Sequence, residues 1–405
     1  AALLAVTLVA GVASALIVPL SWGDRARVPV TPEFVLLWLI AGACALGAAW
    51  QAKFHRLVAL ILLSVVGLAL CITFAWFSAP DLALTQLAVE VVTVVLILLG
   101  LRWMPKRVEQ DDPRIEQRVF WRRRRDLLLA LLIGAGLAAL SYALLTRQAP
   151  LSISPFFIEQ ALPGGGGTNV VNVMLVDFRA FDTLGEITVL GVVGLTVYAL
   201  LRRFRPPQEA IEVPEQQRVE HLGADLLQSP RGDGVPAYMG VPAVLVRLLL
   251  PIAWVFAFYL FMRGHNEPGG GFVAGLVVAI AFIAQYMVAG THWVEDQLRL
   301  QPPRWIALGL LVALLTGLGS LWFAHPFLTT HTAHLTLPLL GEIHVPSAAF
   351  FDLGVFAVVV GATLLLLTAL AHQSLRAQRQ LEAPPETLRG LEKGAAALKG
   401  GAWKS

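Results

Sequence analysis

Three polar side chains recur at helical spacing inside the apolar stretch at residues 80–101. Gln86, Glu90 and Thr93 are four and three residues apart, so on a helix they share one face. Glu90 lies about 13 Å beyond Asp81 along such a helix, near the middle of a membrane. A carboxyl group at that depth costs on the order of a few kcal/mol and usually faces an ion path or a partner. We therefore predict that Glu90 exchanges protons or cations; a protonated acid that only holds helices together is the alternative.

A second group of charges lies at residues 177–186. Arg179, Asp182 and Glu186 follow a spacing of three and four residues and share a helical face, whereas Asp177 points elsewhere. Two interpretations fit this pattern: an ion pair that fixes the position of the helix, or an ion relay at the end of the helix. In the second interpretation, Glu186 is the residue of the group that lies deepest in the membrane. The preceding glycine run, 164–167, is not followed by the Lys-Ser/Thr of a phosphate-binding loop, so nucleotide binding is not favoured.

Residues 263–271 (RGHNEPGGG) are expected to join two helices. His265 and Glu267 could admit protons or cations there, because histidine changes its charge near neutral pH. A structural turn, in which the glycines allow close packing, is the alternative.

Four histidines follow further along the chain, within residues 325–344. Histidines at this spacing can share a metal, but no cysteine or carboxylate cluster accompanies them. The alternation in HLTLPLLGEIHVP instead predicts a small exposed β-hairpin.

The elements that position these residues are membrane helices. Hydrophobic residues make up 57% of the chain and charged residues 14%, against about 25% charged in soluble domains. The sequence therefore predicts an all-α, polytopic integral membrane protein of about ten transmembrane helices. Their expected ranges are 2–20, 34–51, 55–77, 80–101, 126–146, 180–201, 241–262, 271–290, 304–324 and 349–371.

Lysine and arginine concentrate in alternate loops, chiefly 102–125 and 202–240. The positive-inside rule then predicts a multi-pass protein of the cell membrane with both termini in the cytoplasm. The basic cluster at 102–125 is expected to touch anionic lipid, and no nucleic acid is expected as a partner.

Several stretches resemble the Mrp-type multisubunit cation/proton antiporters, which are relatives of the membrane arm of respiratory complex I. Residues 78–101 (SAPDLALTQLAVEVVTVVLILLGL) and 169–190 (NVVNVMLVDFRAFDTLGEITVL) are similar to the carboxy-terminal region of the family's large MrpA protein. Residues 263–276 (RGHNEPGGGFVAGL), with the four helices around them, are similar to MrpB. The chain thus looks like the tail of MrpA fused to MrpB.

The resemblance implies a division into modules. These are the last helix of a preceding antiporter-like module (1–22), a three-helix MrpA module (23–110), a two-helix MrpA module (111–205), a cytoplasmic linker (206–240) and a four-helix MrpB-like module (241–405).

The resemblance also implies a role in exchanging Na⁺, or another monovalent cation, for protons. Glu90 matches a glutamate of the family's transport region, and Asp177, Asp182, Glu186 and His265 fall in family stretches. The implied partners are the antiporter-like MrpA and MrpD proteins, the small MrpC, MrpE, MrpF and MrpG proteins, and membrane lipids. No enzyme activity and no bound cofactor or metal are expected, only the transported ions. The family's long antiporter-like helix bundle is absent, so we do not expect the chain to pump alone.

Two rival functions remain open at this point. The chain could be the membrane module of a redox-driven ion pump related to complex I, or an adaptor that only holds other subunits together.

Overall fold

The structure is a computed structural model of the 405-residue chain. It describes residues 30–52, 55–101, 113–146, 151–203, 240–289, 301–337 and 341–382. Within these ranges, nine helices are long and apolar enough to cross a membrane. They are α2 (Pro32–Gln51), α3 (Arg56–Trp76), α4 (Pro80–Leu101), α5 (Pro113–Thr146), α8 (Ala180–Arg203), α10 (Gly240–Arg263), α11 (Gly271–Ala289), α13 (Pro302–Trp322) and α14 (Ala348–Glu382). The protein is therefore a polytopic helical membrane protein, as predicted. The helix expected at 2–20 lies outside the described residues.

Two helices run well beyond the ranges that hydropathy predicted. Helix α5 begins at Pro113, in the arginine-rich segment, and α14 continues to Glu382. Arginine, glutamine, glutamate, leucine and alanine are good helix formers, so both helices continue where the membrane-like hydropathy stops. Hydropathy therefore marked only the apolar part of each helix.

Three short elements lie between α5 and α8 and were not predicted. They are α6 (Ser154–Gln160), α7 (Val170–Val173) and the π-helical turn η1 (Met174–Phe178). None is long enough to produce a clear helical period in the sequence.

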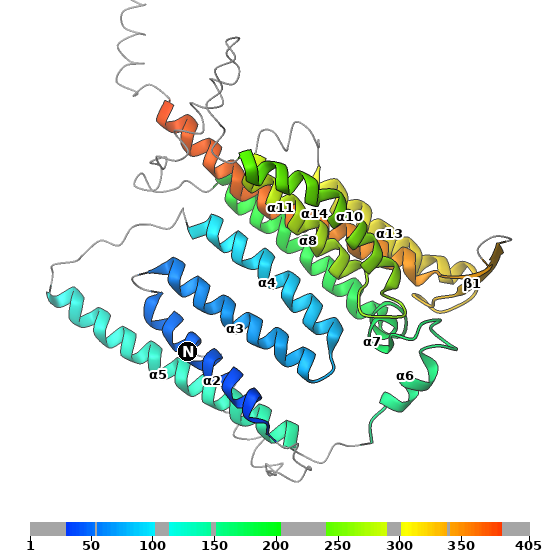
Figure 1. Ribbon diagram of the computed structural model, residues 1–405, viewed down its shortest axis with the longest axis horizontal. Helices are drawn as coiled ribbons and strands as arrows, with labels where there is room; N and C mark the ends of the chain where they lie inside the picture. Colours follow the sequence, from blue (N-terminus) through cyan, green and yellow to red (C-terminus); the bar gives the residue numbers. More distant parts are fainter. Residues whose placement is uncertain are drawn as a thin grey trace, which may run out of the picture. The chain divides into compact units, whose positions relative to one another are not determined.

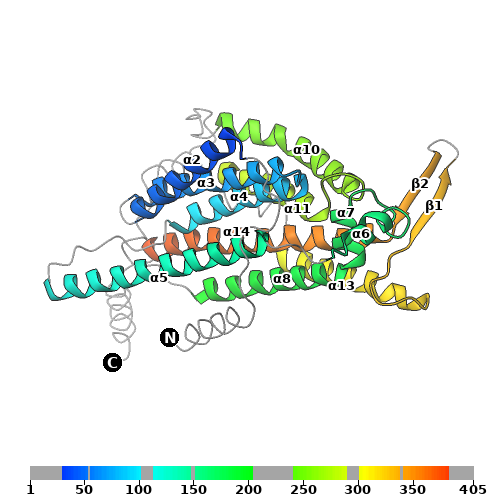
Figure 2. The same cartoon turned by 90° about the horizontal axis from the view of Figure 1, so that it is seen from below.

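The predicted hairpin is present. Strand β1 (Thr332–Leu337) pairs antiparallel with β2 (Gly341–Pro346), with His334 opposite His344 (Figure 2).

The chain divides into two compact units. One comprises residues 1–36 and 107–155 and includes α5; the other comprises residues 37–106 and 156–405. All of the contacts described below lie inside the second unit.

The centre of the second unit is formed by α11 and α14 (Figure 1). Their apolar windows are 61% and 67% buried, against 28% or less for each of the other described spans. Helix α14 packs against α8, α11 and α13, while α4 packs against α3 and α11. The main core cluster joins Ala88 and Val92 of α4 to the buried side chains of α11 and α14.

Glycines let these helices approach closely. A β-carbon on Gly354 of α14 would lie 2.6 Å from the carbonyl oxygen of Gly309 on α13. A β-carbon on Gly309 would likewise lie 2.6 Å from the carbonyl oxygen of Gly354. Small residues at helix contacts are the usual means of tight packing in a membrane.

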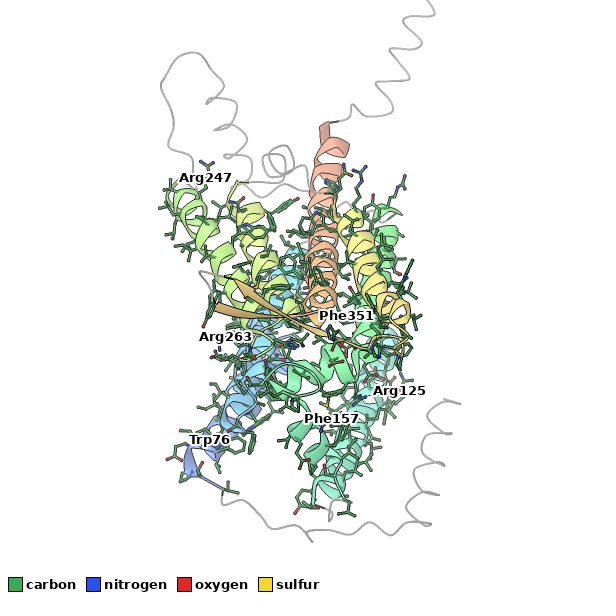
Figure 3. All side chains as sticks on the ribbon, turned by 90° about the vertical axis from the view of Figure 1, so that its right-hand side faces the viewer. Trp76, Arg125, Phe157, Arg247, Arg263 and Phe351 are labelled. Atoms are coloured by element: carbon green, nitrogen blue, oxygen red, sulfur yellow. The ribbon has the colours of Figure 1, made fainter. Side chains whose placement is uncertain are left out.

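Helix α10 is more peripheral and carries Arg247 and Arg263 towards its two ends (Figure 3). Long basic side chains near helix ends can reach the polar membrane interface.

Candidate functional site

One end of the second unit is tied together by what we call the helix-end junction: Asp81, Asn169 and the loop 264–271. The Asn169 side-chain nitrogen donates to the Asp81 Oδ1 atom at 3.3 Å. It also lies 3.1 Å from the carbonyl oxygen of Gly264 and 3.0 Å from that of Glu267. Asn169 is only 8% exposed. A single carboxamide therefore connects the start of α4 with the loop that joins α10 to α11.

Further hydrogen bonds complete the junction. The Gly269 N–H donates to Asp81 Oδ1 at 3.1 Å, and the Asn169 N–H donates to the carbonyl oxygen of His265 at 3.1 Å. The Asn169 side-chain oxygen accepts from the Asn172 N–H at 3.3 Å and so caps α7. Both ends of the Asn169 side chain are thus used.

The loop can reach these partners because its glycines have no side chains. A β-carbon on Gly264 would lie 2.3 Å from the Gly270 nitrogen, and Gly270 has a φ of +100°, which favours glycine. A β-carbon on Gly271 would lie 2.2 Å from the carbonyl oxygen of Asp352. The Gly271 N–H donates to the Asp352 side chain at 2.7 Å, so a carboxyl group of α14 caps the start of α11.

The sequence indicated only part of this arrangement. In the sequence, Asp81 marks only the start of the helix at 80–101; in the structure its carboxyl group accepts from Asn169 and Gly269. Asn169 itself was missed, because its partners lie 88 to 98 residues away along the chain. The only local signal was an asparagine directly before a helix, which is common.

Asp177 and His265, which were singled out separately, come together beside the junction. The Asp177 carboxyl group lies over Gly165, where a β-carbon would be 3.2 Å from Oδ2. The His265 Nε2 atom lies 2.8 Å from the carbonyl oxygen of the same glycine. Burial raises the pKa of the half-buried Asp177 carboxyl group; hydrogen bonds from Thr330 and the charge of His265 oppose this rise but do not cancel it.

The other charges of this region remain apart from Asp177. Arg179 and Asp182 form an exposed ion pair, which is the contact that the ion-pair interpretation of this charge group requires. Glu186 is exposed on α8 and takes part in none of the ion pairs found among the described residues.

Glu90 lies at the contact between α3 and α4. Its carboxyl group lies against Gly67, where a β-carbon would be 2.1 to 2.8 Å from all three carboxyl atoms, and Ser64 lies one helical turn before Gly67 on the same face of α3. Glu90 and Gln86 are half-buried, whereas Thr93 is exposed. On the predicted polar face of α4, Glu90 therefore lies against α3, whereas Thr93 lies on the surface of the chain.

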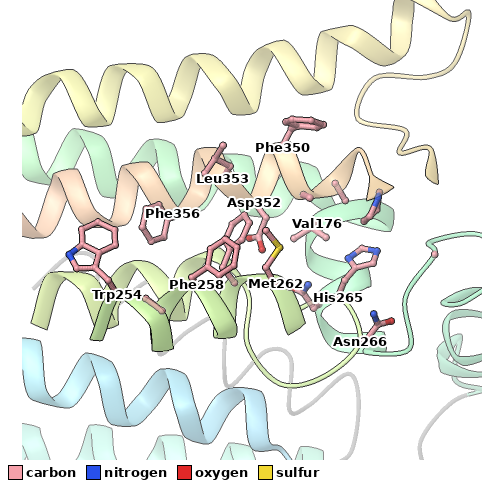
Figure 4. A pocket seen from close by; sticks show the side chains of 17 residues that line it. Val176, Trp254, Phe258, Met262, His265, Asn266, Phe350, Asp352, Leu353 and Phe356 are labelled. Carbon is pink, nitrogen blue, oxygen red and sulfur yellow. The ribbon is translucent and has the colours of Figure 1, made fainter. Parts of the chain in front are cut away.

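A separate pocket of about 680 Å³ lies beside the junction (Figure 4). Trp254, Phe258 and Phe356 contribute to its apolar walls, Asp352 lies near Phe258 and Met262, and His265 and Asn266 lie at the end opposite Trp254. Glu90 is not among its lining residues. In the described part of the chain, no three histidine, cysteine or acidic side chains are grouped as metal ligands.

Three family models match successive parts of the chain. MbhD and MbhE, which describe two subunits of MBH, match residues 39–106 and 121–218. MnhB, a "domain related to MnhB subunit of Na+/H+ antiporter", matches residues 241–365.

Individual relatives agree with these matches. The chain is 55% identical over 353 residues to the probable K⁺/H⁺ antiporter A/B protein of Rhizobium meliloti, covering 86% of this chain and 35% of that protein. It is 36% identical over 131 residues to the Na⁺/H⁺ antiporter B protein of Alkalihalophilus pseudofirmus, covering 32% of this chain and 91% of that protein. The chain belongs to the Mrp-type antiporter subunits, as a fusion of an MrpA tail with MrpB.

A solved structure supports the same assignment. The Mrp complex from Dietzia sp. DQ12-45-1b contains a chain that is 28% identical, with a TM-score of 0.72, covering 91% of this chain and 38% of that chain. Our Mrp-type chain thus spans about a third of the Rhizobium and Dietzia proteins. Its helix-end junction links all three matched segments, since Asp81, Asn169 and the loop 264–271 each fall in a different one.

We predict that the Asn169 amide nitrogen, rather than the oxygen, is what the junction requires. Asn169→Asp would replace the donor with a second carboxylate beside Asp81, and should destabilise the junction by about 1–3 kcal/mol. Hydrogen exchange of the backbone amides at 264–271 should become faster.

Asn266 provides the matched control. Its side-chain oxygen accepts hydrogen bonds from Thr168, so Asn266→Asp retains these contacts. Equal exchange rates in the two variants would contradict the role assigned to Asn169.

A pH-dependent stability should arise from Asp177. Because its pKa is raised on folding, the folded state binds this proton more tightly, and the associated stability is lost as pH rises through the folded-state pKa. Asp177→Asn should therefore gain thermal stability relative to the unmodified chain as the pH rises above about 4, the ordinary pKa of an aspartate. Glu159→Gln, at an exposed position of α6, is the control. A stability difference that is constant with pH would contradict this prediction.

Proposed function

We propose that this chain is a subunit of a monovalent cation/proton antiporter complex in the cell membrane. The observation that carries the proposal is its similarity, over most of its length, to a protein named as a probable K⁺/H⁺ antiporter component. The shorter relative named for Na⁺/H⁺ antiport supports the same class of activity. The exchanged cation is K⁺ or Na⁺, and the test below uses both.

Glu90 is the proposed carboxyl group on the ion path. It occupies the middle of α4, whose described residues otherwise carry only one acid, Asp81 at the helix start. An acid at mid-membrane depth is costly unless a partner or a water-filled path receives it. Gln86, on the same face, is the proposed polar neighbour towards one end of the helix.

The charges near the junction are proposed to have secondary roles. Asp177 and His265 are suited to exchange ions with the aqueous phase, because both lie outside the membrane-spanning helices. The ion pair of Asp182 and Arg179 is proposed to fix the position of the start of α8. Glu186 is exposed, and we propose that it contacts a neighbouring protein of the complex.

The partners are proposed to be other Mrp-type antiporter subunits. Many large apolar side chains on the described spans are exposed in this chain alone. Lipid and neighbouring membrane helices are the two surfaces that would cover them. We propose that both termini lie in the cytoplasm, following the distribution of basic residues.

The deciding experiment is cation-driven proton flux in vesicles that contain the assembled complex. Glu90→Gln should reduce both K⁺- and Na⁺-dependent flux by tenfold or more, on the order of the effect of losing a proton-transfer group. Assembly is checked on a native gel, and Glu159→Gln serves as the control for loss of an acid.

Retained flux in an intact Glu90→Gln complex would contradict the role of Glu90. It would favour the adaptor hypothesis, in which deleting the chain disrupts assembly while the Glu90 carboxyl group is dispensable.

A further inference from the structure

The Glu90 carboxyl group is held by two residues of the neighbouring helix α3. Gly67 is buried, and a β-carbon there would lie 2.1, 2.3 and 2.8 Å from the Oε2, Cδ and Oε1 atoms of Glu90. Real β-carbons do not lie at such distances, so a side chain at residue 67 would force the Glu90 carboxyl group out of its present position. Gly67 is thus in direct contact with the acid.

Ser64 lies one helical turn before Gly67, on the same face of α3, so its hydroxyl group lies beside the Glu90 side chain. Its hydroxyl also donates to the carbonyl oxygen of Leu60 at 3.1 Å. A serine hydroxyl has one hydrogen to donate and two lone pairs that accept. While its hydrogen points to Leu60, it can only accept from Glu90, which requires a protonated carboxyl group.

By rotating, the same Ser64 hydroxyl group can also form a hydrogen bond with the ionised Glu90 side chain. It then donates to the carboxylate and gives up the bond to Leu60, whose carbonyl oxygen is already an acceptor within the helix. Both protonation states of Glu90 therefore keep a partner at a depth where an unsatisfied polar group costs several kcal/mol.

We propose that Gly67 and Ser64 form a carboxyl niche on α3 that positions Glu90 in both its protonated and ionised forms. The inference rests on the proposed function, because Glu90 must change protonation state for the niche to matter to transport. Gly67 and Ser64 are positioning residues: they act through Glu90.

The first test exploits the space at Gly67. Gly67→Ala should lower cation-driven proton flux by about tenfold to a hundredfold, since displacing a reacting group by about 1 Å has effects of this size. Gly100→Ala on α4 is the matched control, because a β-carbon there meets nothing within 4 Å. Glu90→Asp withdraws the carboxyl group by about 1.5 Å, the length of one carbon–carbon bond.

If the niche exists, the effects of Gly67→Ala and Glu90→Asp on proton flux should not be independent. Gly67→Ala should have little further effect on flux in the Glu90→Asp background, because the clash has already been relieved. Once Glu90→Gln has been found to lower flux, losses that multiply, or a Gly67→Ala complex that transports as well as Gly100→Ala, would overturn the proposal.

A second measurement does not depend on transport or on tolerance of a larger residue. In the assembled complex, the infrared C=O band of protonated Glu90 is identified by its loss in Glu90→Gln. Ser64→Ala should shift that band, because the carboxyl proton loses its acceptor. Thr73→Val is the matched control: Thr73 also lies on α3 and donates to the carbonyl oxygen of Ala69 at 2.7 Å, but it lies more than two helical turns beyond Ser64.

The outcomes separate the niche from the transport role. A shifted band together with unchanged flux in Glu90→Gln would support the niche and contradict the proposed function. A band that is identical in Ser64→Ala and in the unmodified complex would overturn the niche, whatever the flux shows.

Discussion

The carboxamide of Asn169 is the interaction on which the arrangement of the second unit depends. Its nitrogen faces one carboxylate and two main-chain carbonyl oxygens, and its oxygen accepts from the Asn172 N–H. Buried polar groups at helix ends require partners, because each unsatisfied group costs about 1–3 kcal/mol. One side chain meets this requirement for three segments that are distant in sequence. The glycines of the loop 264–271 make this possible by bringing the main chain within reach.

The junction and the Glu90 niche are connected through α4. Asp81 holds the first turn of this helix at the junction, and Glu90 occupies its middle. Helix α3 receives the carboxyl group, while α4 also packs into the core through Ala88 and Val92. The acid therefore lies on a helix that is fixed at its end and along its length, which is the kind of rigid support a functional group requires.

Sequence patterns predicted the membrane helices well because an apolar span must be about twenty residues long. For α4 the predicted range 80–101 is the observed one, whereas the polar extensions of α5 and α14 have no hydropathy signal. Glu90 was found because an acid is conspicuous in an apolar run. Gly67 and Ser64 were not, because glycine and serine are ordinary residues in membrane helices. The approach of Asp177 to His265 depends on tertiary contacts and could not be read from spacing. The module boundaries inferred from the family resemblance stay predictions.

If Glu90 lies on the ion path, it should give up a proton when the complex takes up a cation. Proton release from the purified complex, measured with a pH indicator when K⁺ or Na⁺ is added under non-transporting conditions, tests this most directly. We expect the intact complex to release protons and the Glu90→Gln complex to release fewer, because it lacks the proton that Glu90 carries. Equal release from the two complexes would contradict it.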